Sequence, residues 1–315
     1  MRGSNRTQHE QESIAQATGL VNAHAHLELS DLQRPLGVPS IPITDWIPAL
    51  LDYRRSRPPE AAERAVRLGL EESVAAGTTS VADISQDAPP FELAEELGIR
   101  LIGFYEMIGI TPERTAEAVR NAERLFQEPR HSTHQLGLSP HAPYTISREL
   151  LDAAVSLAFE KDVPLAIHLA ESREEMELLA EREGPLRKFM EKIDGWSPDR
   201  TLLGRRPLDY LEAMDRVGRL LVIHGNYLDD EELDWLAERA DRVTVVYCPR
   251  SHAYFGHDPY PLIKMLDKGM HVAIGTDSCA SSPDLSIRAE LATVAQQFPE
   301  LPVETILELG TRPLW

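Results

Sequence analysis

The sequence predicts an α/β fold and, within that class, a (β/α)8 barrel of the TIM type. Short apolar runs rich in strand-forming residues recur along the chain, each is followed by a helical stretch, and there are eight of them. Most runs are hydrophobic at nearly every position, as in parallel strands that are covered on both faces. Eight such units favour a closed barrel over an open doubly wound sheet. The expected strands are 19–27, 79–84, 101–108, 135–139, 164–169, 220–225, 243–248 and 271–275.

The segments between these runs carry charge and helical periodicity. Gly77, Gly98 and Gly269 stand where helices have to end before the next strand begins. No G-x-G-x-x-G follows the first run, which disfavours the open sheet and a dinucleotide-binding role. The stretch 33–48 carries four prolines, and we expect a long irregular loop there, over the mouth of the barrel. The expected helices are 60–76, 147–161, 172–193, 230–240 and 261–268.

Composition limits the classes of partner. The chain has 315 residues, of which 32 are basic and 51 acidic, and its formal net charge is −19. Such an acidic surface argues against a nucleic-acid partner. Residues 1–16 lack the apolar run of a signal peptide, and no run of about 18 apolar residues indicates a membrane span. With only Cys248 and Cys279 present, a reducing compartment is the simpler interpretation, and we expect a cytoplasmic protein.

Histidines and one aspartate stand at the ends of several expected strands. His24 and His26 are two residues apart, so on a strand they point the same way, about 7 Å apart. An isolated pair of this kind is more often packed in a polar core or exposed on a loop. However, His168, His224 and Asp277 each follow an apolar run directly, and in a barrel all these ends meet at one face. Because imidazole and carboxylate suit zinc and iron, the sequence predicts a shared metal site.

Glu171 lies three residues beyond His168, in the loop that follows the fifth run. From that loop its carboxylate can turn back over the metal, take a proton from an activated water and pass it on. The alternative is a glutamate at a helix N-terminus, which the helix dipole favours, because the residues from Ser172 onward have a helical pattern. The neighbouring histidines favour the catalytic interpretation.

This set of motifs resembles the amidohydrolase superfamily, in its deaminase and chlorohydrolase branch. The shared features are H-x-H on the first strand, histidines on the fifth and sixth strands, aspartate on the eighth, and the H-x-x-E spacing of His168 and Glu171. The resemblance extends from about residue 19 to residue 302. Some relatives carry a lysine in the fourth run that becomes carbamylated and bridges two metals. This chain has no lysine there, so a single metal is favoured.

The resemblance implies roles for the strand-end residues. Glu171 would be the proton shuttle, and His224 would orient the attacking hydroxide and could also touch the metal. Asp277 would take a proton from the attacking water as well as bind metal. The implied cofactor is one divalent metal, with zinc favoured and iron the alternative, and its implied ligands are His24, His26, His168 and Asp277.

Longer phrases are similar to the group that holds aminodeoxyfutalosine deaminase and S-adenosylhomocysteine deaminase. They are NAHAHLELS at 22–30, SPHAPY at 139–144, YCPRSH at 247–252 and GTDS at 275–278. In that group the histidine that matches His141 contacts substrate, although a loop position between two prolines explains it equally well. Further candidates for substrate contact, with a salt-bridge or surface role as the alternative, are Glu28, Glu106, Arg250 and His252. His131 and His134 lie in a polar turn and are expected at the surface.

Relatives of this branch carry a small β-sandwich built from residues before the first strand and after the last helix. Here about twenty residues precede the first run and the chain stops at Trp315, so we expect a barrel without the sandwich. Residues 1–18 are expected to be a disordered or partial N-terminal segment, and residues 19–315 a metal-dependent hydrolase barrel. Barrel surface that the sandwich would normally cover could then promote a homo-oligomer.

The expected reaction is hydrolytic deamination of a small molecule, an aminopurine or an adenosine-type nucleoside like aminodeoxyfutalosine, with release of ammonia. A chlorohydrolase or cyclic-amide hydrolase of the same superfamily is the first alternative, and a truncated inactive homologue is the second. Two other classes of metal hydrolase are excluded by motif. The chain has neither H-E-x-x-H nor the H-x-E and P-C-x-x-C pair of the small zinc deaminases.

Overall fold

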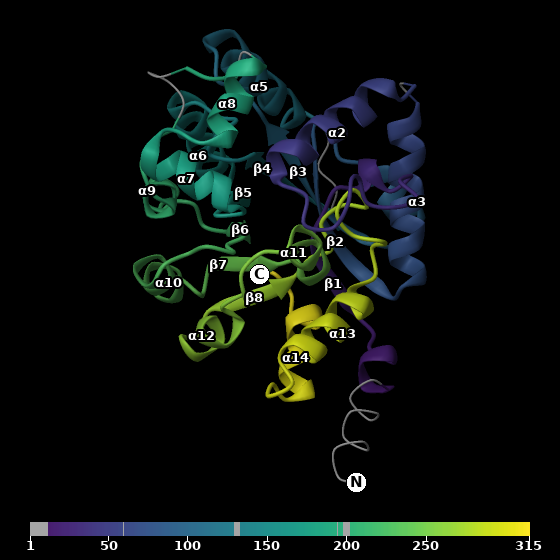
Figure 1. The fold of residues 1–315 in the computed structure, drawn as a ribbon. Helices are drawn as coiled ribbons and strands as arrows, with labels where there is room; N and C mark the ends of the chain where they lie inside the picture. The colour runs from purple at the N-terminus through teal and green to yellow at the C-terminus, as the bar shows by residue number, and fades with distance from the viewer. Residues whose placement is uncertain (1–11, 59, 129–132, 194, 198–201) are drawn as a thin grey trace.

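Eight parallel strands form one sheet in the order β1-β2-β3-β4-β5-β6-β7-β8, as the sequence predicted (Figure 1). The computed structural model describes residues 12–58, 60–128, 133–193, 195–197 and 202–315. The strands are β1 (Leu20–Ala25), β2 (Thr78–Ser85), β3 (Arg100–Met107), β4 (Gln135–Pro140), β5 (Leu165–Leu169), β6 (Leu220–His224), β7 (Val243–Tyr247) and β8 (His271–Ile274). All of them begin and end within two residues of the predicted runs.

The sheet closes on itself between β8 and β1. Ala25 forms a parallel bridge with Asp277, and the backbone N–H groups of Thr276 and Asp277 both donate to the carbonyl of His24, at 3.0 and 3.1 Å. The side chain of Asn22 completes the seam, because its amide donates to Thr276 Oγ1 at 2.8 Å. These contacts bring the first and last strands of the barrel, some 250 residues apart in sequence, to one seam.

The strands are apolar on both faces because each face packs against a different part of the core. Ala82 and Ile84 of β2 belong to a cluster that fills the inside of the barrel. Val81, next to Ala82 in the strand, faces the other way and packs with Leu70 of α3 (Ala61–Ala75). This alternation explains why the runs in the sequence are nearly continuous rather than alternating.

Helices cover the outside of the barrel (Figure 1). Each of the five predicted regions is helical, although one of them is divided in two, and the ends differ by up to three residues. Besides α3, the helices of the described residues include α2 (Ile43–Ser56), α4 (Phe91–Glu96), α5 (Pro112–Leu125), α6 (Arg148–Lys161), α7 (Arg173–Glu181), α8 (Pro185–Lys192), α9 (Pro207–Ala213), α10 (Asp230–Ala237), α11 (Pro249–Phe255), α12 (Leu262–Asp267), α13 (Ile287–Gln297) and α14 (Val303–Thr311), with a short 3-10 turn at Leu27–Leu29.

Two predicted boundaries were wrong. The helix predicted over 172–193 is two helices, because Arg182 and Gly184 both adopt left-handed backbone angles (φ 60° and 103°) and break it. The loop predicted over 33–48 ends at Pro42, where α2 begins. Its fourth proline, Pro48, lies inside the first turns of that helix, so counting prolines placed the loop boundary too late.

The C-terminal residues lie at the end of the barrel where the strands begin. Leu314 belongs to the interior cluster, and its carbonyl lies 3.4 Å from the hydroxyl of Thr244 on β7. The indole of Trp315 donates to the side chain of Gln135 at the start of β4, at 2.9 Å. The two cysteines are buried free thiols. Among the helices of the described residues, none is both long enough and apolar enough to cross a bilayer.

Candidate metal centre and active site

Three histidines meet where the strands end. His24 lies in β1, His26 directly follows that strand, and His168 lies in β5. One ring nitrogen of each is within 4.8 Å of those of the others, so the three form a group that could hold a metal ion. The ring centroid of His24 lies 4.8 Å from that of His26 and 5.0 Å from that of His168. The barrel therefore brings together three side chains that 144 positions separate in sequence (168 − 24).

The hydrogen bonds around these rings leave nitrogens directed at a common centre. His26 Nδ1 lies 2.9 Å from the carbonyl of Ile84, and His168 Nδ1 lies 3.1 Å from the carbonyl of His141. A carbonyl can only accept, so each Nδ1 carries the proton and each Nε2 keeps its lone pair. His24 is fully buried, and neither of its ring nitrogens has a hydrogen-bond partner among the described residues.

Asp277, in the segment that follows β8, completes the group. Its Oδ1 lies 3.6 Å from His24 Nε2 and 3.9 Å from His26 Nε2. Unpartnered imidazole nitrogens in a buried cluster, with a carboxylate beside them, are a donor set that fits a divalent ion such as zinc. The four residues that the sequence singled out as ligands thus fit that group, because ring nitrogens of three buried histidines lie within 4.8 Å of one another and neither nitrogen of His24 has a hydrogen bond among the described residues.

The protonation states agree with metal binding. Burial lowers the pKa of His26 to about 4 and that of His224 to about 3, and it lowers the pKa of His168 well below its usual value with the help of the neighbouring histidines. Although burial opposes ionisation of Asp277, the surrounding histidines hold the pKa of its carboxyl well below the usual range. Neutral imidazole and ionised carboxylate are the forms that bind metal.

Glu171 lies beside this cluster, in the turn after β5. Its Oε1 is 3.5 Å from His224 Nε2, and the side-chain amide of Asn226 donates to its backbone carbonyl at 2.8 Å. Burial and the Asp277 carboxylate raise the pKa of Glu171 well above its usual value. A glutamate with a raised pKa next to a metal cluster is suited to carry a proton near neutral pH.

The turn that carries Glu171 is held by a residue that sequence reasoning missed. Glu175, in the first turn of α7, accepts from the backbone N–H groups of Ala170 and Glu171, both at 2.9 Å. Burial raises the pKa of Glu175 to about 7, against these hydrogen bonds. A glutamate six residues after a strand end is ordinary in sequence, so only the fold reveals that it fixes the turn.

A cavity of about 320 Å³ opens in front of the cluster. Its polar wall contains Glu106 and His141, with Glu106 Oε1 3.7 Å from His141 Nε2. Gln86, which was not predicted, donates to the other oxygen of Glu106 at 2.8 Å. The remaining wall is largely apolar and comes from α2 and α8, with Ile43, Trp46, Ile47, Leu50, Leu51, Phe189 and Met190 among its residues.

Three predicted substrate contacts do not line this cavity. Glu28 pairs with Arg54 and faces a separate groove between α3 and α4. Arg250 binds Glu290, with Nε 2.6 Å from Oε1. The ring of His252 packs edge-on against the stacked rings of Tyr247 and Tyr260, at centroid distances of 5.6 and 5.7 Å. For Glu28 and Arg250, the structure therefore shows the salt-bridge position that the sequence had as the alternative.

His134 lies away from the site, near the start of β3. His134 is half-buried rather than fully exposed, because the backbone N–H of Leu101 donates to its Nδ1 at 3.1 Å. His131 lies outside the described residues.

The chain belongs to the amidohydrolase family, whose family model matches residues 17–311. It is 31% identical to the 5-methylthioadenosine/S-adenosylhomocysteine deaminase of Bacillus cytotoxicus over 314 residues. That alignment covers 93% of this chain and 66% of the relative, so the chain spans slightly less than two thirds of that protein. The resemblance to this family that the motifs indicated is confirmed.

Solved structures of deaminases have the same fold. Helicobacter pylori aminofutalosine deaminase, solved with methylthio-coformycin, matches with a TM-score of 0.77 at 21% identity, over 92% of this chain and 70% of that one. An adenosine deaminase of Xanthomonas campestris with bound zinc matches with a TM-score of 0.70 at 24% identity, over 89% of this chain and 60% of that one. At these identities the likeness supports the barrel fold.

Proposed function

We propose that this chain is a metal-dependent hydrolytic deaminase of an aminopurine or adenosine-type nucleoside, and that it releases ammonia. The observation that carries the proposal is the meeting of a metal-ligand cluster with the Glu171–His224 pair at one wall of a cavity. The name of the Bacillus cytotoxicus relative, a deaminase of adenosine derivatives, supports the choice of reaction.

The residues that would hold one divalent ion are His24, His26, His168 and Asp277. Such an ion would supply Lewis-acid activation of water near neutral pH. Zinc is favoured, because imidazole and carboxylate suit it and a solved adenosine deaminase with this fold contains it. The same ligands suit iron.

The chain's own groups would move the protons. Asp277, whose carboxylate stays ionised, is suited to take the proton of the attacking water as its oxygen bonds to the ring carbon that bears the amino group. His224 lies within reach of Glu171 and would orient that water. Glu171 would protonate the ring nitrogen next to the attacked carbon. The proton held by Asp277 would then go to the amino group, the carbon–nitrogen bond would break and ammonia would leave. The proton of the added hydroxyl would return to Glu171 as the ring carbonyl forms.

The cavity suits a flat heteroaromatic base with an apolar substituent. His141 and Glu106 offer hydrogen-bonding groups to the ring, on the wall beside the metal ligands. Trp46 and Leu50 of α2 and Phe189 of α8 offer apolar surface opposite. A nucleoside of the aminodeoxyfutalosine or methylthioadenosine kind combines both features.

Ammonia release by zinc-loaded protein tests the proposal, against a panel of aminopurines, adenosine-type nucleosides and aminodeoxyfutalosine. Release from one panel member supports the deaminase and identifies its substrate class. Chloride released from chlorinated triazines without ammonia from the panel would replace it by the chlorohydrolase alternative. Silence with folded, zinc-loaded protein would overturn the proposal.

A further inference from the structure

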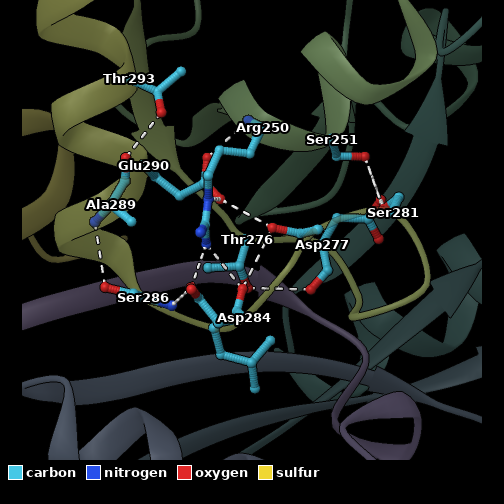
Figure 2. A network of polar contacts seen from close by, with 12 residues as sticks. Arg250, Ser251, Thr276, Asp277, Ser281, Asp284, Ser286, Ala289, Glu290 and Thr293 are labelled. Atoms are coloured by element: carbon cyan, nitrogen blue, oxygen red, sulfur yellow. Dashed lines mark hydrogen bonds and ion pairs between the residues drawn. The ribbon is translucent and has the colours of Figure 1, made fainter. Parts of the chain in front are cut away.

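The carboxylate of Asp277 is held from behind by two serine hydroxyls. Ser251 on α11 and Ser281 in the loop after β8 lie 2.8 and 2.7 Å from the same oxygen, Asp277 Oδ2. The two hydroxyls are 3.0 Å apart, so they meet at one point beside the carboxylate (Figure 2). All three side chains are buried. Each hydroxyl has one proton to donate, and Oδ2 accepts both when the carboxylate is ionised.

The two oxygens of Asp277 therefore have different surroundings. Oδ2 faces the serines, whereas Oδ1 lies 3.6 Å from His24 Nε2 and 3.9 Å from His26 Nε2. The last torsion of an aspartate side chain is soft, so packing alone selects its rotation weakly. Two hydroxyls bound to one oxygen remove that freedom and keep the other oxygen directed at the histidines.

An ion-pair network around the buried Glu290 holds the two segments that carry the serines (Figure 2). Arg250 is next to Ser251. Its Nε donates to Glu290 Oε1 at 2.6 Å, and its Nη2 donates to Asp284 Oδ1 at 2.7 Å. Glu290 is fully buried on α13, and Asp284 lies three residues beyond Ser281. Because these pairs tie α11 to the loop after β8, they set the distance between the two hydroxyls.

We propose that Ser251 and Ser281 are positioning residues that fix Asp277 for metal binding. The proposal rests on the metal site of the proposed function. Loss of either hydroxyl leaves Oδ2 with one hydrogen-bond donor and lets the carboxylate rotate away from the ligand direction. Groups that orient a metal ligand from behind typically contribute about 10- to 100-fold to metal affinity or activity.

The test compares Ser251→Ala and Ser281→Ala with Ser282→Ala. Ser282 is the next residue and is as deeply buried, and its hydroxyl contacts the Asp284 carbonyl (3.3 Å) and Glu290 Oε1 (3.4 Å) rather than Asp277. The measurements are Zn²⁺ affinity by competition with a chelator and the visible absorption spectrum of the Co²⁺-loaded protein. We expect about 10- to 100-fold weaker binding and an altered spectrum in the first two variants, and parent-like values in Ser282→Ala.

A second comparison separates orientation from folding. Ser281→Thr keeps the hydroxyl and should bind Zn²⁺ more tightly than Ser281→Ala, while thermal unfolding of the metal-free proteins reports their intrinsic stability. Parent-like affinity in both alanine variants, or an equal loss in Ser282→Ala, overturns the positioning role and leaves the proposed function intact. A parent protein that takes up no Zn²⁺ overturns both.

Discussion

At the scale of single residues, the site depends on backbone angles that side chains rarely allow. Ala170, His224 and Asp277, each just at or after the end of a site strand, have φ of 53°, 70° and 57°. Such left-handed residues cost about 1–2 kcal/mol each. Ile223 faces the barrel interior, so side-chain alternation along the strand would point the next residue, His224, to the outside. The left-handed backbone angle at His224 instead directs its ring inward, 5.5 Å from the ring of His168. Tyr260 donates to the His224 carbonyl at 2.9 Å and helps to hold this turn.

Glu171 gives the most direct residue-scale prediction. We expect Glu171→Gln to keep its metal and lose about 100- to 10,000-fold in kcat, because the amide cannot exchange the proton. Metal content by elemental analysis and steady-state ammonia release measure the two effects. Glu174→Gln, three residues along in α7, is the control. Parent-like turnover in Glu171→Gln would remove this residue from the chemistry.

Arg250 tests whether the ion-pair network is structural. We expect Arg250→Ala to lower the free energy of unfolding by about 3–5 kcal/mol, since it leaves the buried Glu290 carboxyl without its partner. Denaturant unfolding measures this loss. Lys268→Ala, which breaks a more exposed pair with Asp234, should cost at most about 1 kcal/mol. A stable Arg250→Ala variant with a raised KM would instead support the substrate contact that the sequence suggested.

At the scale of elements, two helices rather than the barrel shape the cavity. α2 and α8 contribute its apolar wall, and Trp46 ties α2 to the loop after β8 because its indole donates to the Ala280 carbonyl at 3.0 Å. The strands contribute the ligands and the polar wall. The reacting groups thus lie at the strand ends, and the apolar surface that shapes the cavity lies on the two helices.

Trp46→Ala tests this division. We expect KM to rise while kcat stays within a few-fold of the parent, because α2 contacts the cavity but carries none of the reacting groups. Trp46→Phe, which keeps the ring and loses the indole N–H, should lie between the two. Trp235→Phe on α10, outside the cavity, is the matched control. A fall in kcat with KM unchanged would show that α2 acts on the reaction itself.

At the scale of the whole molecule, the barrel keeps a buried histidine at the end opposite the site. His271 begins β8, its Nδ1 lies 3.0 Å from Thr244 Oγ1, and its Nε2 has no hydrogen-bond partner among the described residues. Leu314 and Trp315 lie at the same end. Burial lowers the pKa of His271 to about 4, so the folded barrel holds this ring neutral.

This gives a pH-dependent stability. The unfolded chain binds a proton at His271 near pH 6.5, whereas the folded chain does so only near pH 4. Stability from this residue is therefore complete above pH 6.5 and falls as the pH drops toward 4. Buried acids with raised pKa values, such as Glu290, act in the opposite direction. The measurement is the difference in unfolding free energy between the parent and His271→Gln at several pH values. Below pH 6.5 the parent should lose stability relative to the variant, because only the parent has this histidine to protonate on unfolding. A difference that stays constant with pH would contradict the prediction.

The sequence by itself determined the fold class and the ligand types. Hydrophobic runs of strand length can be recognised from neighbouring residues alone. Because the ends of parallel barrel strands meet at one face, these runs also predict that His24, His168 and Asp277 lie close together. Periodicity is likewise local, which is why the five expected helical regions were found and the break at Gly184 was not.

Only the tertiary structure decided which polar residues face the cavity and which form ion pairs and hydrogen bonds within the barrel. Glu106 and Arg250 both follow or end a strand, yet one lines the cavity and the other is bound by Glu290. Gln86, Glu175, Ser251 and Ser281 carry no sequence signal for their positions. The physical reason is that a side chain's role depends on partners brought to it from distant segments, and those distances are set by how the barrel closes rather than by neighbours in the chain.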